Sequence, residues 1–110
     1  MAQFTAKEAK KILSSFNGEK RFWVTDGTIL KNLRELVKTL RKMGENTFTY
    51  HCNEEKNDFR NWIRDVMCDE QLANAIARLN GKEEMATRIE KRIIELRGII
   101  RREREKRIKK

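Results

Sequence analysis

The stretch from residue 81 to residue 110 constrains the fold of this chain more than any other. Apolar side chains recur there at every third or fourth position, at Met85, Ile89, Ile93, Leu96 and Ile100. This spacing predicts an α-helix with one apolar stripe, and such a stripe needs a partner surface. At about 1.5 Å per residue the helix would span on the order of 40 Å, more than the body of so small a domain requires. We therefore expect it to project from the body.

Beyond the stripe the helix becomes a basic arm. Arg97, Arg101 and Arg104 lie at i, i+4 and i+7 beside the apolar face, so their guanidinium groups can follow a phosphate backbone. The alternative is a solvated helix end, stabilised by pairs such as Glu103 with Arg107 at about 0.2 to 0.5 kcal/mol each. That alternative leaves the excess of positive charge in the arm without an explanation. The basic residues from position 101 onward are Arg101, Arg102, Arg104, Lys106, Arg107, Lys109 and Lys110.

The composition favours a polyanionic partner. Lys and Arg number 26 against 17 Asp and Glu, which gives a formal net charge of +9. No apolar run approaches the roughly 20 residues that span a membrane, so no membrane partner is expected. Cys52 and Cys68 are the only cysteines, and no apolar leader opens the chain. These features predict a cytoplasmic protein in a reducing setting.

The segment from Ile29 to Met43 predicts the helix that supplies the central core. Its apolar residues keep helical spacing over about four turns, and the turn at residues 25–28 can cap it. The opposite face carries a second basic stripe, for which a solvated helix face is the alternative. This stripe consists of Lys31, Arg34, Lys38, Arg41 and Lys42.

Shorter helices are predicted on both sides of this segment. Thr5 to Glu8 matches a capping box, which starts a helix that ends near Asn17-Gly18. Two further helices are expected after residue 56, one capped by Asn57 or Asp58 and one, over residues 70–79, capped by Asp69. Residues 45–55 are expected to form a loop or an irregular turn. The region 45–70 holds three basic and seven acidic residues, a net charge of −4.

Phe22-Trp23-Val24 is rich in strand formers but has no evident partner strand. We therefore expect an extended connector there, with Phe22 and Trp23 in the core rather than forming a platform for a stacked base. The patterns together predict an all-α fold: a compact bundle of about four short helices, followed by one long, projecting, basic C-terminal helix. The expected division is a helical domain over residues 1–80 and the long amphipathic helix over residues 81–110.

The middle of the chain resembles a small, largely archaeal helical domain family of unknown function. The residues that carry the resemblance are Asp26-Gly27, Leu33, Leu36, Phe48, Tyr50, His51, Asn53, Asn57-Asp58-Phe59, Trp62-Ile63, Asp69 and Leu72-Ala73. The resemblance covers about Phe22 to Ala73. The family also occurs appended to sugar-processing enzymes, but the resemblance brings no known activity, and the basic arm departs from the appended form. It implies a cytoplasmic archaeal helical domain.

No constellation in the sequence indicates catalysis. His51-Cys52 with Cys68 or Asp58 offers metal-ligand residue types, but the spacing matches no compact zinc motif. His51 is instead expected to donate to a backbone carbonyl or to cap a helix. A glycine-rich phosphate loop and a dinucleotide fingerprint are both absent from the sequence. We predict a non-enzymatic protein without a metal, a cofactor or a small-molecule substrate.

Two functions remain open at this point. The first is nucleic-acid binding through phosphates, without sequence-specific readout, with RNA in a ribosomal or other ribonucleoprotein setting ahead of duplex DNA. Its contacts would be Arg97, the basic arm and the second basic stripe. The second is a protein-interaction or oligomerisation module, in which the apolar stripe from Met85 to Ile100 forms a coiled-coil seam with a partner helix or a second copy. The two can coexist, because a dimer would present two basic arms.

Overall fold

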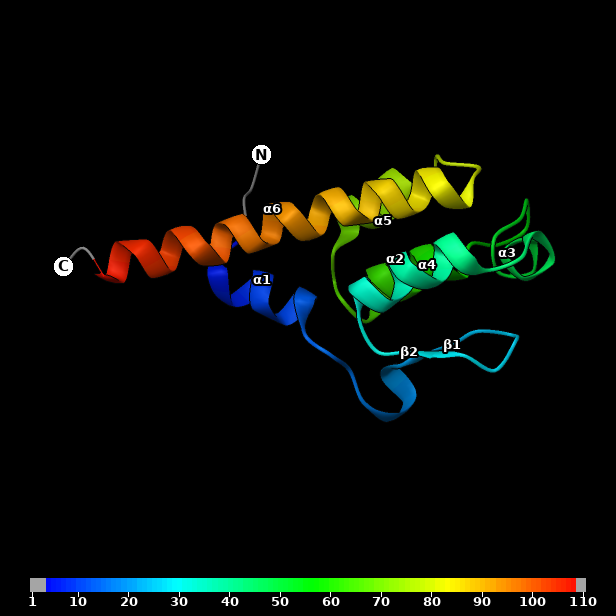
Figure 1. The fold of residues 1–110 in the computed structure, drawn as a ribbon, viewed down its shortest axis with the longest axis horizontal. Coiled ribbons are helices and arrows are strands. Elements are labelled where there is room, and N and C mark those ends of the chain that lie inside the picture. The colour runs from blue at the N-terminus through cyan, green and yellow to red at the C-terminus, as the bar shows by residue number, and fades with distance from the viewer. Residues whose placement is uncertain (1–3, 109–110) are drawn as a thin grey trace.

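A long helix runs along the longest axis of the molecule, and the shorter elements gather against it (Figure 1). The structure is a computed structural model that describes residues 4–108, whose principal extents are 53 × 29 × 22 Å. The fold is mostly helical, as predicted, and it also contains a small two-stranded sheet. The elements within the described range are α1 (Ala6–Leu13), η1 (Gly18–Lys20), β1 (Phe22–Trp23), β2 (Ile29–Leu30), α2 (Leu33–Lys42), α3 (Glu45–His51), α4 (Asp58–Asp65), α5 (Glu70–Ile76) and α6 (Lys82–Ile108).

The apolar stripe of α6 finds its partner surface within the chain itself. Met85, Ile89 and Leu96 have no exposed surface, Ile93 is 6% exposed, and Ile100 is partly buried against the same cluster. α1, α2 and α5 pack against α6 and supply the opposite side of this core. The side chains predicted as an oligomer seam are thus largely the core of one chain. A seam between two chains through them would require that core to open.

α6 follows α5 after a short turn and packs directly against the helices that precede it. α6 shares one hydrophobic cluster with the helices that precede it. At its first residue, the Lys82 ammonium donates to the Met43 carbonyl, which ties α6 to the end of α2. The division of the chain at residue 80 stays a prediction about domain organisation.

Residues 22–30 form a β-hairpin, whereas the sequence predicts an extended connector followed by the start of a helix. β1 and β2 pair in antiparallel register, with Phe22 opposite Leu30 and Trp23 opposite Ile29. Gly27 makes the turn possible, because its φ of +100° lies where residues with a side chain are strained. The sequence does not reveal the partner strand of Phe22-Trp23, because Ile29-Leu30 also fits the helical spacing of the segment that follows.

The hairpin separates the two aromatic residues that we expected in the core. Successive side chains of a strand point to opposite faces. Phe22 is buried and stacks near Phe59, whereas Trp23 is 62% exposed. The expectation that Trp23 is a core residue is therefore wrong, and its exposed face lies beside its cross-strand partner Ile29.

The start of α2 also differs from the prediction. The helix begins at Leu33, and the Asn32 side chain caps it by accepting a hydrogen bond from the Glu35 N–H at 2.9 Å. The turn at residues 25–28 therefore closes the hairpin instead of capping a helix. Residues 45–55, predicted as a loop, contain α3, because burial of Phe48 and His51 outweighs the weak helix propensity of Thr47 and Thr49.

Other helix starts agree with the sequence, but two helices end earlier than predicted: α1 ends at Leu13 rather than near Asn17-Gly18, and α5 ends at Ile76 rather than at residue 79. Thr5 and Glu8 form both halves of the predicted capping box, at 3.1 and 2.9 Å. Asn57 caps α4, and Asp69 caps α5 by accepting from the Leu72 N–H at 3.0 Å. Short polar side chains before an apolar repeat are thus reliable marks of these helix starts.

The two ends of the molecule differ in charge. α3 and the polar turn after it, part of the acidic region 45–70, lie at the end where α6 begins, and the basic end of α6 extends past α1 at the opposite end (Figure 1). Within residues 4–108 no helix has the length and apolar character needed to cross a membrane.

Candidate nucleic-acid interface

α2 and α6 enclose a surface groove of about 530 Å³, which we call the α2–α6 groove. Each helix turns apolar residues into the groove. α2 contributes four cations, whereas α6 contributes one cation, Arg97, and one carboxylate, Glu90. The lining residues are Arg34, Val37, Lys38, Arg41, Lys42, Glu90, Ile93, Ile94 and Arg97. Five cations therefore face one carboxylate, an excess of four positive charges. The structure brings Arg97 together with four of the five residues of the second basic stripe, which lie far away in the sequence.

One ion pair braces the groove across its two helices. The Arg41 guanidinium donates to both carboxylate oxygens of Glu90, at 3.2 and 3.3 Å, and also lies 3.5 Å from Glu83. The hydrogen bond from Arg41 lowers the pKa of Glu90 below its ordinary value of 4.5, and the same bond raises the pKa of Arg41. Arg41 is thus engaged within the chain and has the least freedom to meet a ligand.

The other four cations of the groove are available to an external anion. Arg34, Lys38, Lys42 and Arg97 are exposed and form no ion pair with another residue of the described range. Long basic side chains on apolar stems can reach over the groove floor while keeping their charged heads in water. The solvated-face alternative accounts for exposure of this kind, but it does not account for the meeting of the α2 stripe with Arg97 of α6 at one groove.

The positive surface continues along α6 toward its C-terminal end. A second depression of about 440 Å³ shares Ile94 and Arg97 with the α2–α6 groove and adds Arg101 and Arg104. Arg101 lies 3.9 Å from Glu105, at exposed positions where such a pair is weak. The predicted series Arg97, Arg101 and Arg104 therefore forms one track that leads out of the groove.

The remaining predicted contact residues lie elsewhere. Lys31 is exposed but does not line the groove, and Lys109 and Lys110 lie outside the described residues. Arg102, Lys106 and Arg107 turn to another side of α6, where they line a hollow of about 710 Å³ between α6 and α1. We call it the α1–α6 hollow. Its lining residues are Phe4, Thr5, Ala6, Lys7, Lys10, Ile99, Arg102, Glu103, Lys106 and Arg107.

The α1–α6 hollow also collects lysines that the sequence patterns did not single out. Lys7 and Lys10 of α1 face it together with the three cations of α6, against one carboxylate, Glu103. Arg107 lies 3.7 Å from Glu103, so the predicted pair is present. Lys7 and Lys10 read as ordinary exposed positions of an amphipathic helix. The packing of α1 along α6 places these two lysines in the same hollow as the cations of the basic arm.

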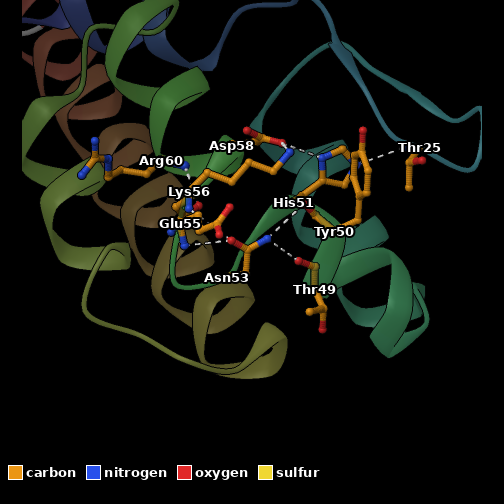
Figure 2. A network of polar contacts seen from close by, with 10 residues as sticks. Thr25, Thr49, Tyr50, His51, Asn53, Glu55, Lys56, Asp58 and Arg60 are labelled. Carbon is orange, nitrogen blue, oxygen red and sulfur yellow. Dashed lines mark hydrogen bonds and ion pairs between the residues drawn. The ribbon is translucent and has the colours of Figure 1, made fainter.

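His51 serves the fold rather than this surface. Figure 2 shows its ring between the hairpin and α4: Nε2 accepts a hydrogen bond from the Thr25 N–H, and Nδ1 lies 3.0 Å from Asp58 Oδ2, which Lys56 also contacts. Because Nε2 is the acceptor, Nδ1 carries the hydrogen and donates to Asp58. The prediction that His51 donates to a backbone carbonyl or caps a helix is therefore wrong. The buried ring of His51, on α3, connects the hairpin turn at Thr25 with Asp58 of α4. His51 and Asp58 are both among the residues that carry the family resemblance.

A neighbouring turn is organised by one asparagine. The Asn53 side chain accepts from the Glu55 and Lys56 N–H groups and donates to the Thr49 carbonyl at 2.8 Å (Figure 2). These contacts close the segment between α3 and α4 without a glycine. Asn53 is thus another residue of the resemblance whose role here is structural.

A buried ion pair under α6 is a feature that the sequence analysis does not predict. Arg92 lies on the buried side of α6, with Nε 3.0 Å from Oδ2 of the fully buried Asp69, and its guanidinium donates to Gln71 at 2.7 Å. The ring of Phe4 covers the guanidinium at 5.2 Å. Arg92 lies at i+3 from Ile89, on the apolar face of the helix, and a charge at this position was the available signal.

The candidate metal ligands are not assembled into a site. Among residues 4–108 no three His, Cys, Asp or Glu side chains cluster as metal ligands would. Cys52 is partly buried, and burial raises the pKa of its thiol, while Cys68 is exposed.

The fold and these surfaces define a small helical protein in which one long helix carries basic side chains on two of its sides. The chain belongs to the DUF5752 family, a family of unknown function, whose model matches residues 3–98. No curated protein and no solved structure matches the chain. The matched range contains the whole α2–α6 groove, while Arg101 to Arg107 lie beyond it. The archaeal origin and the link to sugar-processing enzymes that the resemblance implies stay predictions.

Proposed function

We propose that this protein binds nucleic acid through its phosphates, using the α2–α6 groove and the arginine track that leads from it. The observation that carries the proposal is the meeting of the basic stripe of α2 with Arg97 of α6, distant in sequence, at one groove. Four cations of this groove form no ion pair with another residue of the described range. Phosphate contacts of this kind give affinity and position without reading the base sequence. Binding is therefore expected to depend strongly on salt and weakly on sequence, with RNA ahead of duplex DNA.

The charge separation along the molecule supports an oriented approach. The acidic region 45–70 would be repelled by a polyanion, while the opposite end of the molecule would be attracted to it. A nucleic acid would thus meet the end of α6 and the groove first. We also propose that the protein acts in this way without catalysing a reaction and without a metal or cofactor.

The test is a salt series of binding to a 16-base-pair RNA duplex, the matching DNA duplex and a single-stranded RNA. Four to five phosphate contacts on a duplex predict a slope of log K against log salt of about −4. The variant carrying Arg34→Glu, Lys38→Glu and Lys42→Glu should bind at least tenfold more weakly, with a slope flatter by about 2 to 3.

A matched control separates the groove from the net charge. Lys20→Glu, Arg78→Glu and Lys91→Glu change the charge by the same amount at exposed positions that line neither the α2–α6 groove nor the α1–α6 hollow. The control should lose much less affinity than the groove variant. Equal losses in the two variants, or wild-type protein that binds none of the three ligands at low salt, would contradict the proposal.

Association of two chains is the alternative function. A seam through Met85, Ile89, Ile93 and Leu96 competes with the core that these side chains form within one chain. Light-scattering mass on the same samples would test association independently of nucleic acid.

A further inference from the structure

The end of α6 is basic on two opposite sides. Arg97 and Lys106 are nine residues apart, which is about two and a half turns, so they point in opposite directions. Arg97, Arg101 and Arg104 line the track that leaves the α2–α6 groove, whereas Arg102 and Lys106 line the α1–α6 hollow. The sequence shows only a dense run of cations, but the flanking helices divide that run between two surfaces.

The two sides offer similar numbers of cations without an ion pair to another described residue. In the α2–α6 groove and its track these are Arg34, Lys38, Lys42, Arg97 and Arg104, and in the α1–α6 hollow they are Lys7, Lys10, Arg102 and Lys106. A solvated helix end does not need lysines from a second helix aimed at the same hollow. A single phosphate backbone lying on one side of α6 would leave the cations of the other side without a partner.

We propose that the end of α6 inserts between two phosphate backbones, so that one protein chain holds two nucleic-acid segments. The inference rests on the proposed function and adds that the ligand is a folded or paired assembly with backbones on both sides of the helix. Lys7 and Lys10 are then contact residues, together with Arg102 and Lys106. A helix about 10 Å wide keeps the two backbones apart, and its cations offset their mutual repulsion.

The experiment uses two 16-base-pair RNA duplexes of the same sequence, one carrying a donor dye and the other an acceptor. With duplex in excess at low salt, the wild-type chain should form a complex of one protein and two duplexes and give energy transfer between them. Mass by analytical ultracentrifugation fixes the stoichiometry. A variant with Lys7→Glu, Lys10→Glu and Lys106→Glu should bind one duplex within about threefold of wild-type affinity and lose the energy transfer.

The outcomes distinguish the two proposals. A wild-type chain that binds one duplex at every concentration, and loses it in the groove variant, would support the proposed function and overturn the two-sided inference. Energy transfer that survives in the Lys7, Lys10 and Lys106 variant would also overturn it, as would a complex containing two protein chains. Binding of no duplex by the wild-type chain would overturn the two-sided inference, and binding of neither duplex nor single-stranded RNA would overturn both. The substituted positions are exposed and leave the Thr5 and Glu8 cap in place, so circular dichroism and melting should match wild type.

Discussion

The two halves of α6 use one helical repeat for opposite purposes. From Lys82 to Leu96 each turn buries a side chain against α1, α2 or α5, and from Arg97 onward each turn presents cations to solvent. The contrast is sharpest at two neighbours: Ile93 is 6% exposed and Ile94 is 65% exposed. Periodicity thus tells which face of a helix is apolar, but it does not tell which surface covers that face.

Truncating isoleucines at the two kinds of position should give a large difference in stability. Ile89→Ala removes a fully buried side chain and leaves a cavity, which costs about 2 to 5 kcal/mol of unfolding free energy. The same change at Ile94 should stay within about 0.5 kcal/mol, because that side chain is largely exposed. Urea unfolding of both variants measures the difference. If Ile89→Ala proved as mild as Ile94→Ala, the stripe would not be the core of one chain.

The arginines of the two halves offer the next comparison. Arg92→Met should cost about 3 to 5 kcal/mol, because it leaves the buried Asp69 carboxylate without its charge partner. Arg97→Met, on the exposed side, should change stability by less than about 0.5 kcal/mol and weaken nucleic-acid binding instead. Thermal melting and the salt series together separate the two roles. Equal stability losses would contradict the division of α6 into a packing half and a binding half.

Arg92 and Arg97 also show which parts of the candidate site can be predicted from the sequence. Arg97 and the series that follows it were found from charge and helical spacing alone, and the structure places them on one track. The α2–α6 groove could not be predicted, because local periodicity does not reveal which faces of two distant helices meet. Arg92 was missed for a related reason: its partner Asp69 was understood only as a helix cap, and the same carboxylate also serves the ion pair.

The hairpin and His51 mark a second limit. Ile29-Leu30 satisfies helical and strand patterns equally, so only pairing with Phe22-Trp23 decides its conformation. His51 accepts a hydrogen bond from the Thr25 N–H, 26 positions away in the sequence, and no local sequence pattern predicts such a contact. Helix caps were predictable because they depend on residues three positions apart, whereas these features depend on tertiary contacts.

Removing residues 101–110 should have a smaller effect on stability than either buried substitution. The loss includes two exposed pairs, Arg101 with Glu105 and Arg107 with Glu103, which together contribute roughly 1 kcal/mol or less. Ile99 and Ile100, which pack against the core, remain in the shortened chain. The melting temperature should therefore shift by only a few degrees, while duplex affinity falls. A large drop in melting temperature would show that the arm packs on the body.

The last prediction concerns Glu90→Gln, for which we expect a small change in stability. This substitution removes the ion pair that Arg41 forms with Glu90 across the α2–α6 groove. Arg41 lowers the pKa of Glu90, so the pair stabilises the fold above pH 4.5 and this contribution disappears as the pH falls through the lowered pKa. The variant should thus be slightly less stable at neutral pH and should lose less stability than wild type on acidification.

The same substitution should strengthen binding, because it removes the carboxylate Glu90 from the groove lining and leaves Arg41 with only the weaker contact to Glu83. We expect about a twofold to tenfold gain in duplex affinity at low salt and a salt slope steeper by roughly 1. Glu83→Gln is the matched control, since Glu83 lies only 3.5 Å from Arg41 Nε but does not line the groove. An unchanged affinity and slope in Glu90→Gln would mean that the ligand does not enter the α2–α6 groove, and the phosphate contacts would then be confined to the end of α6.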